Sequence, residues 1–334
     1  MTLILGLETS CDETACAIVQ DGRKLVAQSV KTQALIHQTF GGVIPEVAAR
    51  HHLEAINEVI DDVLHQSKID KKDLTAIACT NGPGFVGALL VGLSAAKAIA
   101  WSWSKPLIAV DHLFAHVCAN YIDTTLEPPF LCLLVSGGHT QLVHFCDYQT
   151  ATILGQTLDD AVGEAYDKVA RMLGLGYPGG PAIDNLARGG NPDAFALPEG
   201  NVDQFDFSYS GLKTAVLRTI EKLEKNIDKN NNPDNLPLAD LAASFQKAAN
   251  QILVKKTLQA AKQLDLSTVV LAGGVAANSD LRKRFSELSE VKVFMPPLKY
   301  CTDNAVMVAA CAHFMNTNAQ MDISVYSRQK RKNR

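Results

Sequence analysis

The sequence predicts an α/β fold built from two related lobes that face a cleft. Three observations lead to this prediction. The chain has 334 residues, enough for two domains of about 150 residues each. Segments with a strand pattern alternate with segments of helical periodicity. The order of elements before residue 125 also recurs in part after it. We expect a first lobe over residues 1–125, a second over 126–327 with the terminal helix able to pack back on the first, and a basic tail over 328–334.

The first lobe is predicted from apolar runs and one periodic stripe. Short apolar runs indicate strands, and an uncharged stretch after a glycine turn indicates a mostly buried helix. The predicted strands are Leu3–Leu7, Ala15–Val19, Lys24–Ser29, Leu74–Cys79 and Leu107–Val110. The predicted helices are Val43–His65, with Leu53, Ile56, Val59, Ile60 and Val63 on one stripe, then Gly87–Trp103 and a helix from about His112.

The second lobe begins after a linker at Asp123–Pro129. Two strands are expected around a glycine turn, followed by a mainly helical stretch over residues 159–264 that contains a polar loop. Two further strands, each followed by a helix, complete the lobe. The predicted strands are Phe130–Val135, Thr140–His144, Val269–Ala272 and Val291–Phe294, and the loop is Asn226–Pro237.

Composition excludes several classes of protein. The net charge of −4 rules out a protein that holds nucleic acid by bulk charge, although five of the residues in 328–334 are basic. That tail is either a phosphate-binding arm or a solvated terminus. The long uncharged span Leu74–Ala96 contains the turn Asn81-Gly-Pro-Gly84, which argues against a membrane helix. The eight scattered cysteines form no C-x-x-C pair, so we expect a reducing, cytoplasmic compartment and no membrane.

Glycine turns follow four of the predicted strands. Such turns allow backbone N–H groups to approach phosphate oxygens, and a following helix adds its positive end. Several of them at the carboxyl ends of strands indicate a nucleotide site. We expect the turns at Val135–Thr140 and Ala272–Asn278 to face one another across the cleft, with a phosphate near Ser136–Gly138. The four turns are Gly6–Glu13, Asn81–Gly87, Val135–Thr140 and Ala272–Asn278.

His112 and His116 have the spacing of two metal ligands. On a helix, residues four apart lie on one face within reach of one ion, although a bare H-x-x-x-H is also compatible with two ordinary histidines. A metalloprotease would need a glutamate after the first histidine, and this chain has Leu113. Asp303 is a candidate third ligand, with a helix N-cap as the alternative. Asp167 and Asp184 lie beside glycine turns, where each is a candidate for binding hydroxyl groups, or else a cap or a solvated residue.

The motifs together resemble those of the bacterial TsaD family, the tRNA N6-adenosine threonylcarbamoyltransferases. The resemblance extends from Gly6 to about Phe314. Departures from the family pattern occur at Ala15, Phe114-Ala115 and Ala305, and none removes a proposed ligand. The motifs are Glu8-Thr-Ser-Cys-Asp-Glu-Thr14, Gly82-Pro-Gly84, Val91-Gly92, Val135-Ser-Gly-Gly-His-Thr140, Gly163–Lys168, Tyr177–Pro181, Phe207-Ser-Tyr-Ser-Gly-Leu-Lys213, Ala243-Ser-Phe-Gln246, Gly273-Gly-Val-Ala-Ala-Asn278 and Cys301-Thr-Asp-Asn304.

The resemblance implies an actin-like, hexokinase-like (ASKHA) fold with a cleft between duplicated α/β lobes. It implies transfer of a threonylcarbamoyl group from threonylcarbamoyl-AMP to N6 of the adenosine next to the anticodon, in tRNAs that read codons starting with A. His112, His116 and Asp303 would hold one divalent ion, Fe²⁺ or Zn²⁺. Positions that match adenylate-binding residues are Val135, Ser136, Gly137, Gly138, His139, Asp167, Gly180, Asp184 and Asn278.

The resemblance also implies partners: a TsaB-like paralogue in a heterodimer, docked on helices of the first lobe, and a TsaE-like ATPase. Asp12 and Glu13, in the loop after the first strand, are our candidates for the general base, with a structural role as the alternative. Three other readings compete. They are an ATPase or sugar kinase of the same fold, a non-catalytic scaffold like TsaB, and a metalloprotease. Bound metal would separate the transferase from the kinase, which needs neither His112 nor His116.

Overall fold

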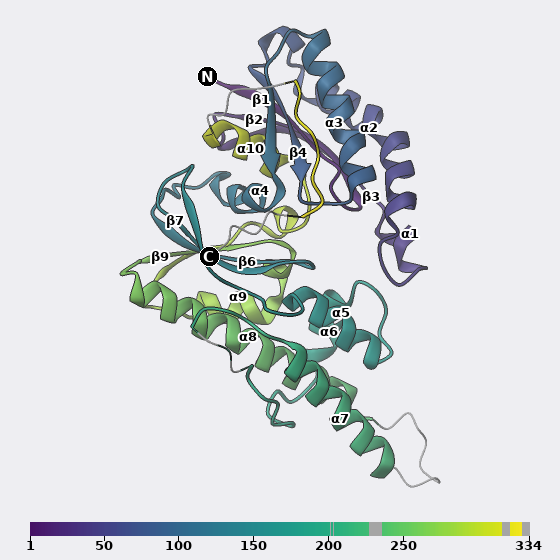
Figure 1. Ribbon diagram of the computed structural model, residues 1–334, viewed down its shortest axis with the longest axis vertical. Helices are drawn as coiled ribbons and strands as arrows, with labels where there is room; N and C mark the ends of the chain where they lie inside the picture. The colour runs from purple at the N-terminus through teal and green to yellow at the C-terminus, as the bar shows by residue number, and fades with distance from the viewer. Residues whose placement is uncertain (201, 203, 227–235, 316–320, 329–334) are drawn as a thin grey trace. The chain divides into compact units, whose positions relative to one another are not determined.

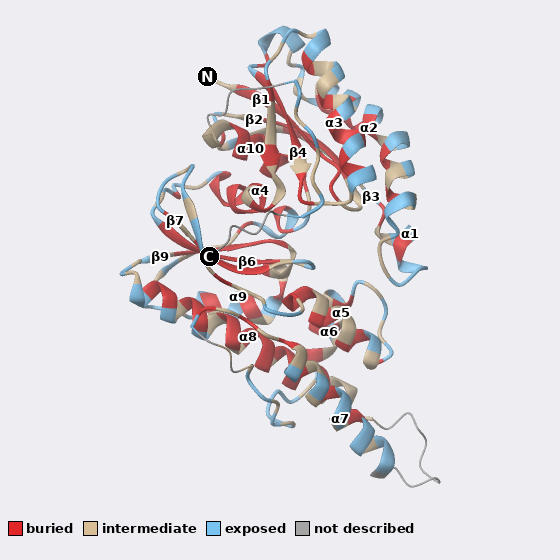
Figure 2. Ribbon diagram, viewed as in Figure 1, coloured by how far each residue is buried: buried red, intermediate tan, exposed pale blue. Residues whose placement is uncertain are grey.

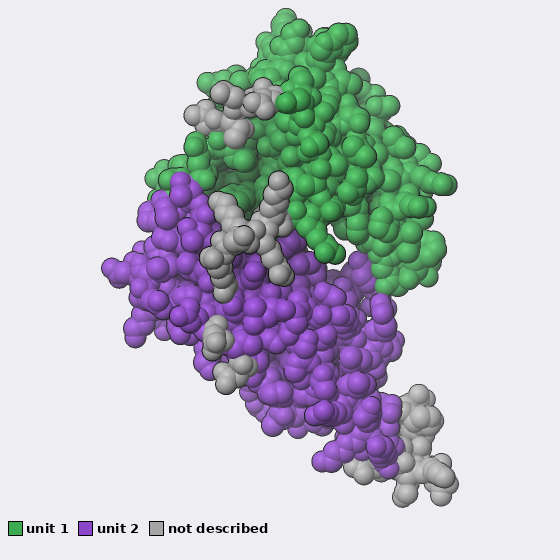
Figure 3. Space-filling model, in the orientation of Figure 1, with its two compact units in different colours: residues 1–128, 147–149, 296–334 green, residues 129–146, 150–295 purple. Residues whose placement is uncertain are grey.

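The computed structural model describes residues 1–200, 202, 204–226, 236–315 and 321–328, and its chain forms two compact units (Figure 3). Unit 1 contains Met1–Pro128, Asp147–Gln149 and the described part of Pro296–Arg334, and unit 2 contains the rest. Residues 329–334 of the expected basic tail lie outside the described residues, as does most of the expected loop Asn226–Pro237.

Unit 1 is built on a five-stranded sheet of order β3-β2-β1-β4-β5 (Figure 1). β1 pairs antiparallel with β2 and parallel with β4, and β4 pairs parallel with β5. The strands are β1 (Leu3–Glu8), β2 (Glu13–Gln20), β3 (Lys24–Thr32), β4 (Ala76–Gly82) and β5 (Leu107–Asp111). The helices are α1 (Ala34–Gln38), α2 (Pro45–Ser67), α3 (Val86–Ser102), α4 (His112–Cys118) and α10 (Ala305–Met315).

The core of unit 1 follows from the apolar runs of its sequence. All six residues of β1 are buried, as expected for a central strand covered on both faces (Figure 2). Leu5 and Leu7 are fully buried, and each such leucine contributes roughly 1.5–3 kcal/mol. The stripe predicted on α2 packs into this core through Ile56, Val59, Ile60 and Val63, whereas Leu53 is 64% exposed.

A glycine in β1 sets how closely α10 approaches the sheet. A Cβ atom at Gly6 would lie 2.7 Å from the carbonyl oxygen of Ala305 and 2.8 Å from the backbone nitrogen of Ala309. Only glycine therefore allows α10 to rest directly on β1. Because α10 begins at Ala305, this contact also fixes the residues just before it, including Asp303.

Unit 2 is built on a five-stranded sheet of order β10-β9-β6-β7-β8. Strands β6, β7 and β8 form an antiparallel meander, while β9 pairs parallel with both β6 and β10. The strands are β6 (Phe130–Val135), β7 (Thr140–Phe145), β8 (Ala151–Gln156), β9 (Thr268–Ala272) and β10 (Lys292–Phe294). The helices are α5 (Val162–Met172), α6 (Gly179–Ala187), α7 (Ser210–Asn226), α8 (Leu238–Gln263) and α9 (Ser279–Ser286).

The two sheets share one topology, which confirms the predicted fold class. Each has an antiparallel meander of three strands, then two parallel strands added beside the first strand of the meander. Strand β8 was not predicted, because its residues are mostly half-buried or exposed at the edge of the sheet. The five-residue helix α1 was also not predicted. The first segment of unit 1 ends at Pro128, and α10 with its flanking residues also belongs to unit 1, as the expected ranges allowed for the terminal helix.

Within the described residues, no helix has both the length and the apolar character needed to cross a membrane. The uncharged span Leu74–Ala96 instead contributes strand β4, a turn and most of α3.

Candidate functional site

Helix α4 holds the two histidines that the sequence singled out. It begins where β5 ends, at His112, as predicted. The Asp111 carboxylate caps it by accepting hydrogen bonds from the backbone N–H groups of Leu113 (2.9 Å) and Phe114 (3.1 Å). The cap satisfies two N–H groups that would otherwise lack partners. His112 and His116 then lie one turn apart on the same face.

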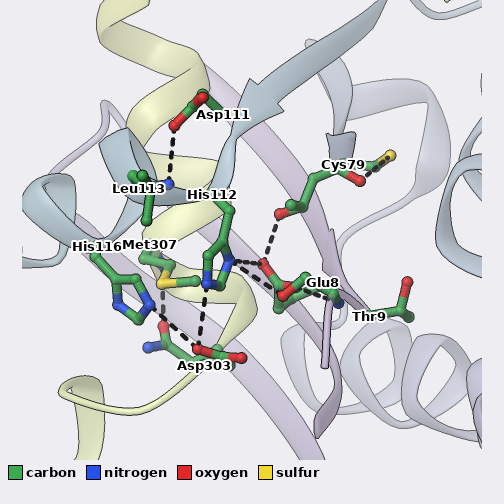
Figure 4. Close-up of polar contacts among 12 residues, drawn as sticks. Glu8, Thr9, Cys79, Asp111, His112, Leu113, His116, Asp303 and Met307 are labelled. Carbon is green, nitrogen blue, oxygen red and sulfur yellow. Dashed lines mark hydrogen bonds and ion pairs between the residues drawn. The ribbon is translucent and has the colours of Figure 1, made fainter. Parts of the chain in front are cut away.

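Asp303 completes a cluster with these histidines (Figure 4). Its Oδ1 lies 3.1 Å from Nε2 of His116 and 3.6 Å from Nε2 of His112. One ligand atom from each of the three residues fits within 4.8 Å of the others. The alternative role of Asp303 as a helix cap is not what the structure shows, because Asn304 accepts the N–H of Met307 at 3.0 Å. The Asp303 carboxylate faces the imidazoles instead.

Glu8 lies behind His112, a position that the sequence analysis missed. Its side chain is fully buried, and Oε2 is 3.4 Å from Nδ1 of His112. The backbone N–H of Ser10 (2.6 Å) and the hydroxyl of Thr80 (2.5 Å) donate to this carboxylate. A carboxylate on the second nitrogen of a histidine orients the ring toward a ligand on the first. A charged residue ending the wholly apolar run Leu3–Leu7 was the available signal.

The charged side chains of this cluster shift one another's pKa values. Burial lowers the pKa of His112, but the carboxylates of Asp303 and Glu8 outweigh burial and raise the pKa to about 9. Burial raises the pKa of Asp303, but His112 and His116 outweigh it and bring the pKa down to about 2. Without a cation, two carboxylates therefore hold a protonated His112 at neutral pH. A divalent ion would replace this proton as the positive charge.

We expect the metal-free protein to lose stability as the pH rises from 6.5 to 9. The pKa of folded His112, about 9, lies above its ordinary value of 6.5. Its contribution is therefore fully present below pH 6.5 and is lost as the pH passes through 9. The loss should be on the order of 3 kcal/mol. Chemical denaturation of chelator-treated protein across this range tests the prediction. His112→Gln should flatten the dependence of stability on pH, and His51→Gln, at a half-buried position on α2, should not. Equal slopes in the two variants would contradict the prediction.

The residues fit a divalent metal ion. Two imidazoles and one carboxylate leave coordination positions open, a set typical of non-haem Fe²⁺ sites and also suited to Zn²⁺. Nε2 of His112 and Nε2 of His116 both face Oδ1 of Asp303, so these two nitrogens and the carboxylate are the atoms that would bind the ion.

Asp12 and Glu13 lie where β1 turns into β2. The Glu13 carboxylate accepts a hydrogen bond from the Thr32 hydroxyl at 3.1 Å. Burial, together with the nearby charges of Asp303 and Asp12, raises the pKa of Glu13 to about 10. Glu13 is therefore a neutral acid at pH 7 in the absence of a cation and cannot accept a proton in that state.

The glycine turn of unit 2 lies at the end of β6. The Ser136 N–H donates to the carbonyl of His139 (2.8 Å), and the His139 N–H donates to the Ser136 hydroxyl (3.1 Å), which closes the turn. Gly137 and Gly138 are exposed, and a Cβ atom on either would meet nothing within 4 Å. The start of α5 packs directly on this turn, because a Cβ at Gly163 would lie 2.6 Å from the Ser136 carbonyl oxygen.

The second turn of unit 2 does not face the first, which corrects our expectation. Val135 ends β6 and Ala272 ends β9, and these strands are parallel neighbours in one sheet. A Cβ at Gly273 would lie 2.4 Å from the Val135 carbonyl oxygen. The turns therefore lie side by side, because the carboxyl ends of adjacent parallel strands meet at one edge of a sheet.

Asn278 and Asp184 belong to one buried polar network. The Asn278 amide donates to Gln246 Oε1 (2.8 Å) and to Asp184 Oδ1 (3.3 Å). Its oxygen accepts from the Leu281 N–H and from Asn250, both at 2.9 Å. These four bonds use the full capacity of the Asn278 side chain. Asn278 therefore orients Asp184, and the sequence analysis did not assign a role to Gln246 or Asn250.

Asp167 joins α5 to α6. Its Oδ1 accepts the N–H of Gly179 at 2.8 Å. Burial raises the pKa of Asp167 above its ordinary value. Gly180 follows in the first turn of α6, with open space where a Cβ would stand. The predicted adenylate positions thus all lie in unit 2, and the predicted metal ligands all lie in unit 1.

These features define the class of the protein. Two α/β units of identical strand order, each with a three-stranded antiparallel meander extended by two parallel strands, are the features of an actin-like ASKHA protein. A crystal structure of HypF from T. kodakarensis has this fold: the TM-score is 0.63 at 15% identity, over 94% of this chain and 47% of that chain. This likeness shows the fold alone.

Sequence comparison then gives the family. The sequence model of TsaD, the tRNA N6-adenosine threonylcarbamoyltransferase, matches residues 24–310. A protein of that name from Thermosipho africanus is 50% identical over 317 residues, 93% of each chain. Another from Nostoc punctiforme is 51% identical over 93% of this chain and 90% of its own. The chain belongs to the TsaD family of tRNA threonylcarbamoyltransferases, which are acyltransferases.

Proposed function

We propose that this protein transfers the threonylcarbamoyl group of threonylcarbamoyl-AMP to N6 of the adenosine next to the anticodon, in tRNAs that read codons starting with A. The reaction would take place in the cytoplasm. The observation that carries the proposal is the convergence of His112, His116 and Asp303 within 4.8 Å, in a chain of the tRNA-modifying family.

The chemistry needs an activated acyl group. The exocyclic amine of adenine is a weak nucleophile, and a carbamoyl carbonyl is a weak electrophile. The mixed anhydride with AMP provides this activation. When N6 attacks it, a bond forms between N6 and the carbamoyl carbon, and the bond from that carbon to the phosphate oxygen breaks. AMP leaves with the electron pair, and N6 loses one proton.

In our proposal, His112, His116 and Asp303 hold one divalent ion, Fe²⁺ or Zn²⁺, with Glu8 orienting His112. The ion would supply Lewis-acid stabilisation of negative charge at its open positions. Nε2 of His112 and Nε2 of His116 both face one oxygen of Asp303. An ion bound between these three atoms would displace the proton from His112.

Unit 2 would hold the adenylate. The exposed backbone of Gly137 and Gly138 offers N–H groups for the phosphate, beside Ser136 in the turn that runs from Val135 to His139. Asp167, Gly180 and Asp184 would contact the nucleoside, with hydroxyl groups as the natural partners of the carboxylates. Asn278 would act through Asp184, because its own amide is fully bonded.

For the general base we retain Asp12 and Glu13 as the candidates. Glu13, with its pKa near 10, is a proton donor at neutral pH unless a cation lowers that pKa. With the ion bound, either of the two carboxylates would accept the N6 proton, directly or through water.

Reconstitution tests the proposed reaction. Purified protein, its partners, a tRNA transcript and prepared threonylcarbamoyl-AMP should yield the modified nucleoside and AMP in equal amounts, measured by mass spectrometry of digested tRNA and by chromatography. A transcript with guanosine at the position next to the anticodon is the control. AMP release without modified nucleoside, or modification of the control transcript, would show that the proposal is wrong.

A partner would dock on helices of unit 1, and we propose a TsaB-like paralogue, with a TsaE-like ATPase joining the pair. Four large apolar side chains are exposed over residues 35–44: Leu35 (80%), Ile36 (36%), Phe40 (58%) and Ile44 (38%). Exposed apolar side chains that gather in this way mark an interaction site. With a net charge of −4, the chain is also a poor tRNA binder without partners.

We expect the double substitution Leu35→Asp and Phe40→Asp to abolish co-elution with the TsaB-like partner and to reduce modification by at least about 10-fold. Two buried charges at an interface cost several kcal/mol. Size-exclusion chromatography and the reconstituted assay provide the measurements. The matched control is Trp101→Ala, which removes an apolar side chain that is 80% exposed elsewhere in unit 1. Sustained turnover by the chain without any partner would contradict the requirement.

A further inference from the structure

Residues 321–328, here called the C-terminal strap, run beside β4 and α3 in unit 1 (yellow in Figure 1). The Tyr326 N–H donates to the carbonyl of Asn81 at 3.0 Å, and the Asn81 amide donates to the carbonyl of Ser324 at 3.3 Å. The Lys97 ammonium donates to the carbonyl of Ile323 at 2.6 Å. The strap is therefore held by its backbone on two neighbouring elements.

The strap also fits closely against the end of β4. A Cβ at Gly82 would lie 2.3 Å from the Tyr326 carbonyl oxygen, and Gly82 has a φ of +148°. Glycine is thus needed there both for its conformation and for the approach of the strap. Ile323 and Val325 pack against the hydrophobic core of unit 1. The strap is consequently fixed in one position by hydrogen bonds and apolar contacts.

One side chain of the strap reaches the helix of the metal centre. The Tyr326 hydroxyl donates to Asp111 Oδ2 at 2.6 Å, a short hydrogen bond to a carboxylate. The other oxygen of Asp111 caps α4 through Leu113 and Phe114. The two oxygens of one carboxylate thus join the strap to the first turn of α4, whose first residue is His112.

We propose that Tyr326 is a positioning residue for the metal centre. Its hydroxyl fixes the orientation of the Asp111 carboxylate, Asp111 fixes the first turn of α4, and that turn directs His112 toward Asp303. The strap lies beyond residue 310, where the match to the family's sequence model ends. The inference rests on the proposed role of the His112–His116–Asp303 cluster in binding metal.

Tyr326→Phe removes only the hydroxyl, and Tyr148→Phe is its matched control. Tyr148 also lies in unit 1, where its hydroxyl accepts a hydrogen bond from Arg23 at 3.2 Å. Hydrogen exchange of the metal-free proteins, followed by mass spectrometry, reports the order of α4. We expect exchange at Leu113 and Phe114 to rise about 10-fold in Tyr326→Phe and to stay within about 2-fold in Tyr148→Phe. Unchanged exchange in Tyr326→Phe would overturn the proposal.

Titration with Co²⁺, followed by its visible absorption, measures the effect on the metal centre. We expect Tyr326→Phe to weaken Co²⁺ binding by about 10-fold, at the low end for groups that orient metal ligands, and Tyr148→Phe to leave it unchanged. Faster exchange with unchanged Co²⁺ affinity would also overturn the positioning role. If the unsubstituted protein binds no Co²⁺, the proposed metal centre fails, and the exchange of α4 still decides whether Tyr326 orders that helix.

Discussion

Replacing His116 by alanine is expected to remove the bound metal ion and to lower the rate of threonylcarbamoyl transfer by at least about 1,000-fold. His116 is almost fully buried, and its Nε2 lies 3.1 Å from Asp303. Loss of one of three protein ligands leaves two, too few to hold an ion against water and chelators. Removing groups that only orient ligands already costs 10–100-fold in affinity or activity, so loss of a ligand itself should cost more.

Metal content by mass spectrometry and transfer in the reconstituted assay provide the two measurements. The control is His51→Ala, at a half-buried position on α2 where the imidazole pairs with Glu54. Thermal unfolding should show that both variants are folded. Full metal stoichiometry in His116→Ala would mean that the ion binds elsewhere. Loss of the metal with an unchanged rate of transfer would show that the reaction does not need the ion.

The apolar pattern predicted most of the fold, because the buried strands are continuous apolar runs. Leu3–Leu7 and Phe130–Val135 match β1 and β6 closely, and the first residue of α4 was also predicted. Strand β8 was not predicted, because an edge strand whose side chains are mostly exposed or half-buried has no apolar run. The sequence analysis allowed the terminal helix to pack on the first lobe, but the contact between Gly6 and Ala305 that holds α10 there joins distant residues and leaves no local signal.

The sequence predicted the candidate metal ligands but not the residues that hold them in place. Spacing alone suggested His112 and His116, since four residues make about one helical turn. Glu8, Thr80 and Tyr326 join this site only through the sheet and the strap, more than 70 residues from the helix in two of the three cases. Their roles follow from tertiary contacts, which the pattern of a single chain does not contain.

Substituting Gly137 by leucine is expected to abolish adenylate binding while leaving the fold intact. A Cβ at Gly137 meets nothing within 4 Å, and its φ lies outside the left-handed region. The free energy of unfolding should therefore change by no more than about 0.5 kcal/mol. The new side chain would nevertheless occupy the space from which a phosphate reaches the backbone N–H groups. We expect at least a 100-fold loss of affinity, about 2.8 kcal/mol, for a non-hydrolysable threonylcarbamoyl-adenylate analogue in calorimetry.

Substitutions at two other glycines of unit 2 distinguish a loss of adenylate binding from a loss of stability. Gly189→Leu also enters open space, with its nearest neighbour at 3.9 Å, and should keep both stability and affinity. Gly163→Ala should lose both, because its Cβ would lie 2.6 Å from the Ser136 carbonyl oxygen and force the turn itself to move. Unchanged adenylate affinity in Gly137→Leu would place the phosphate away from Ser136–Gly138. Loss of affinity with equal loss of stability would show that the turn supports the fold more than the ligand.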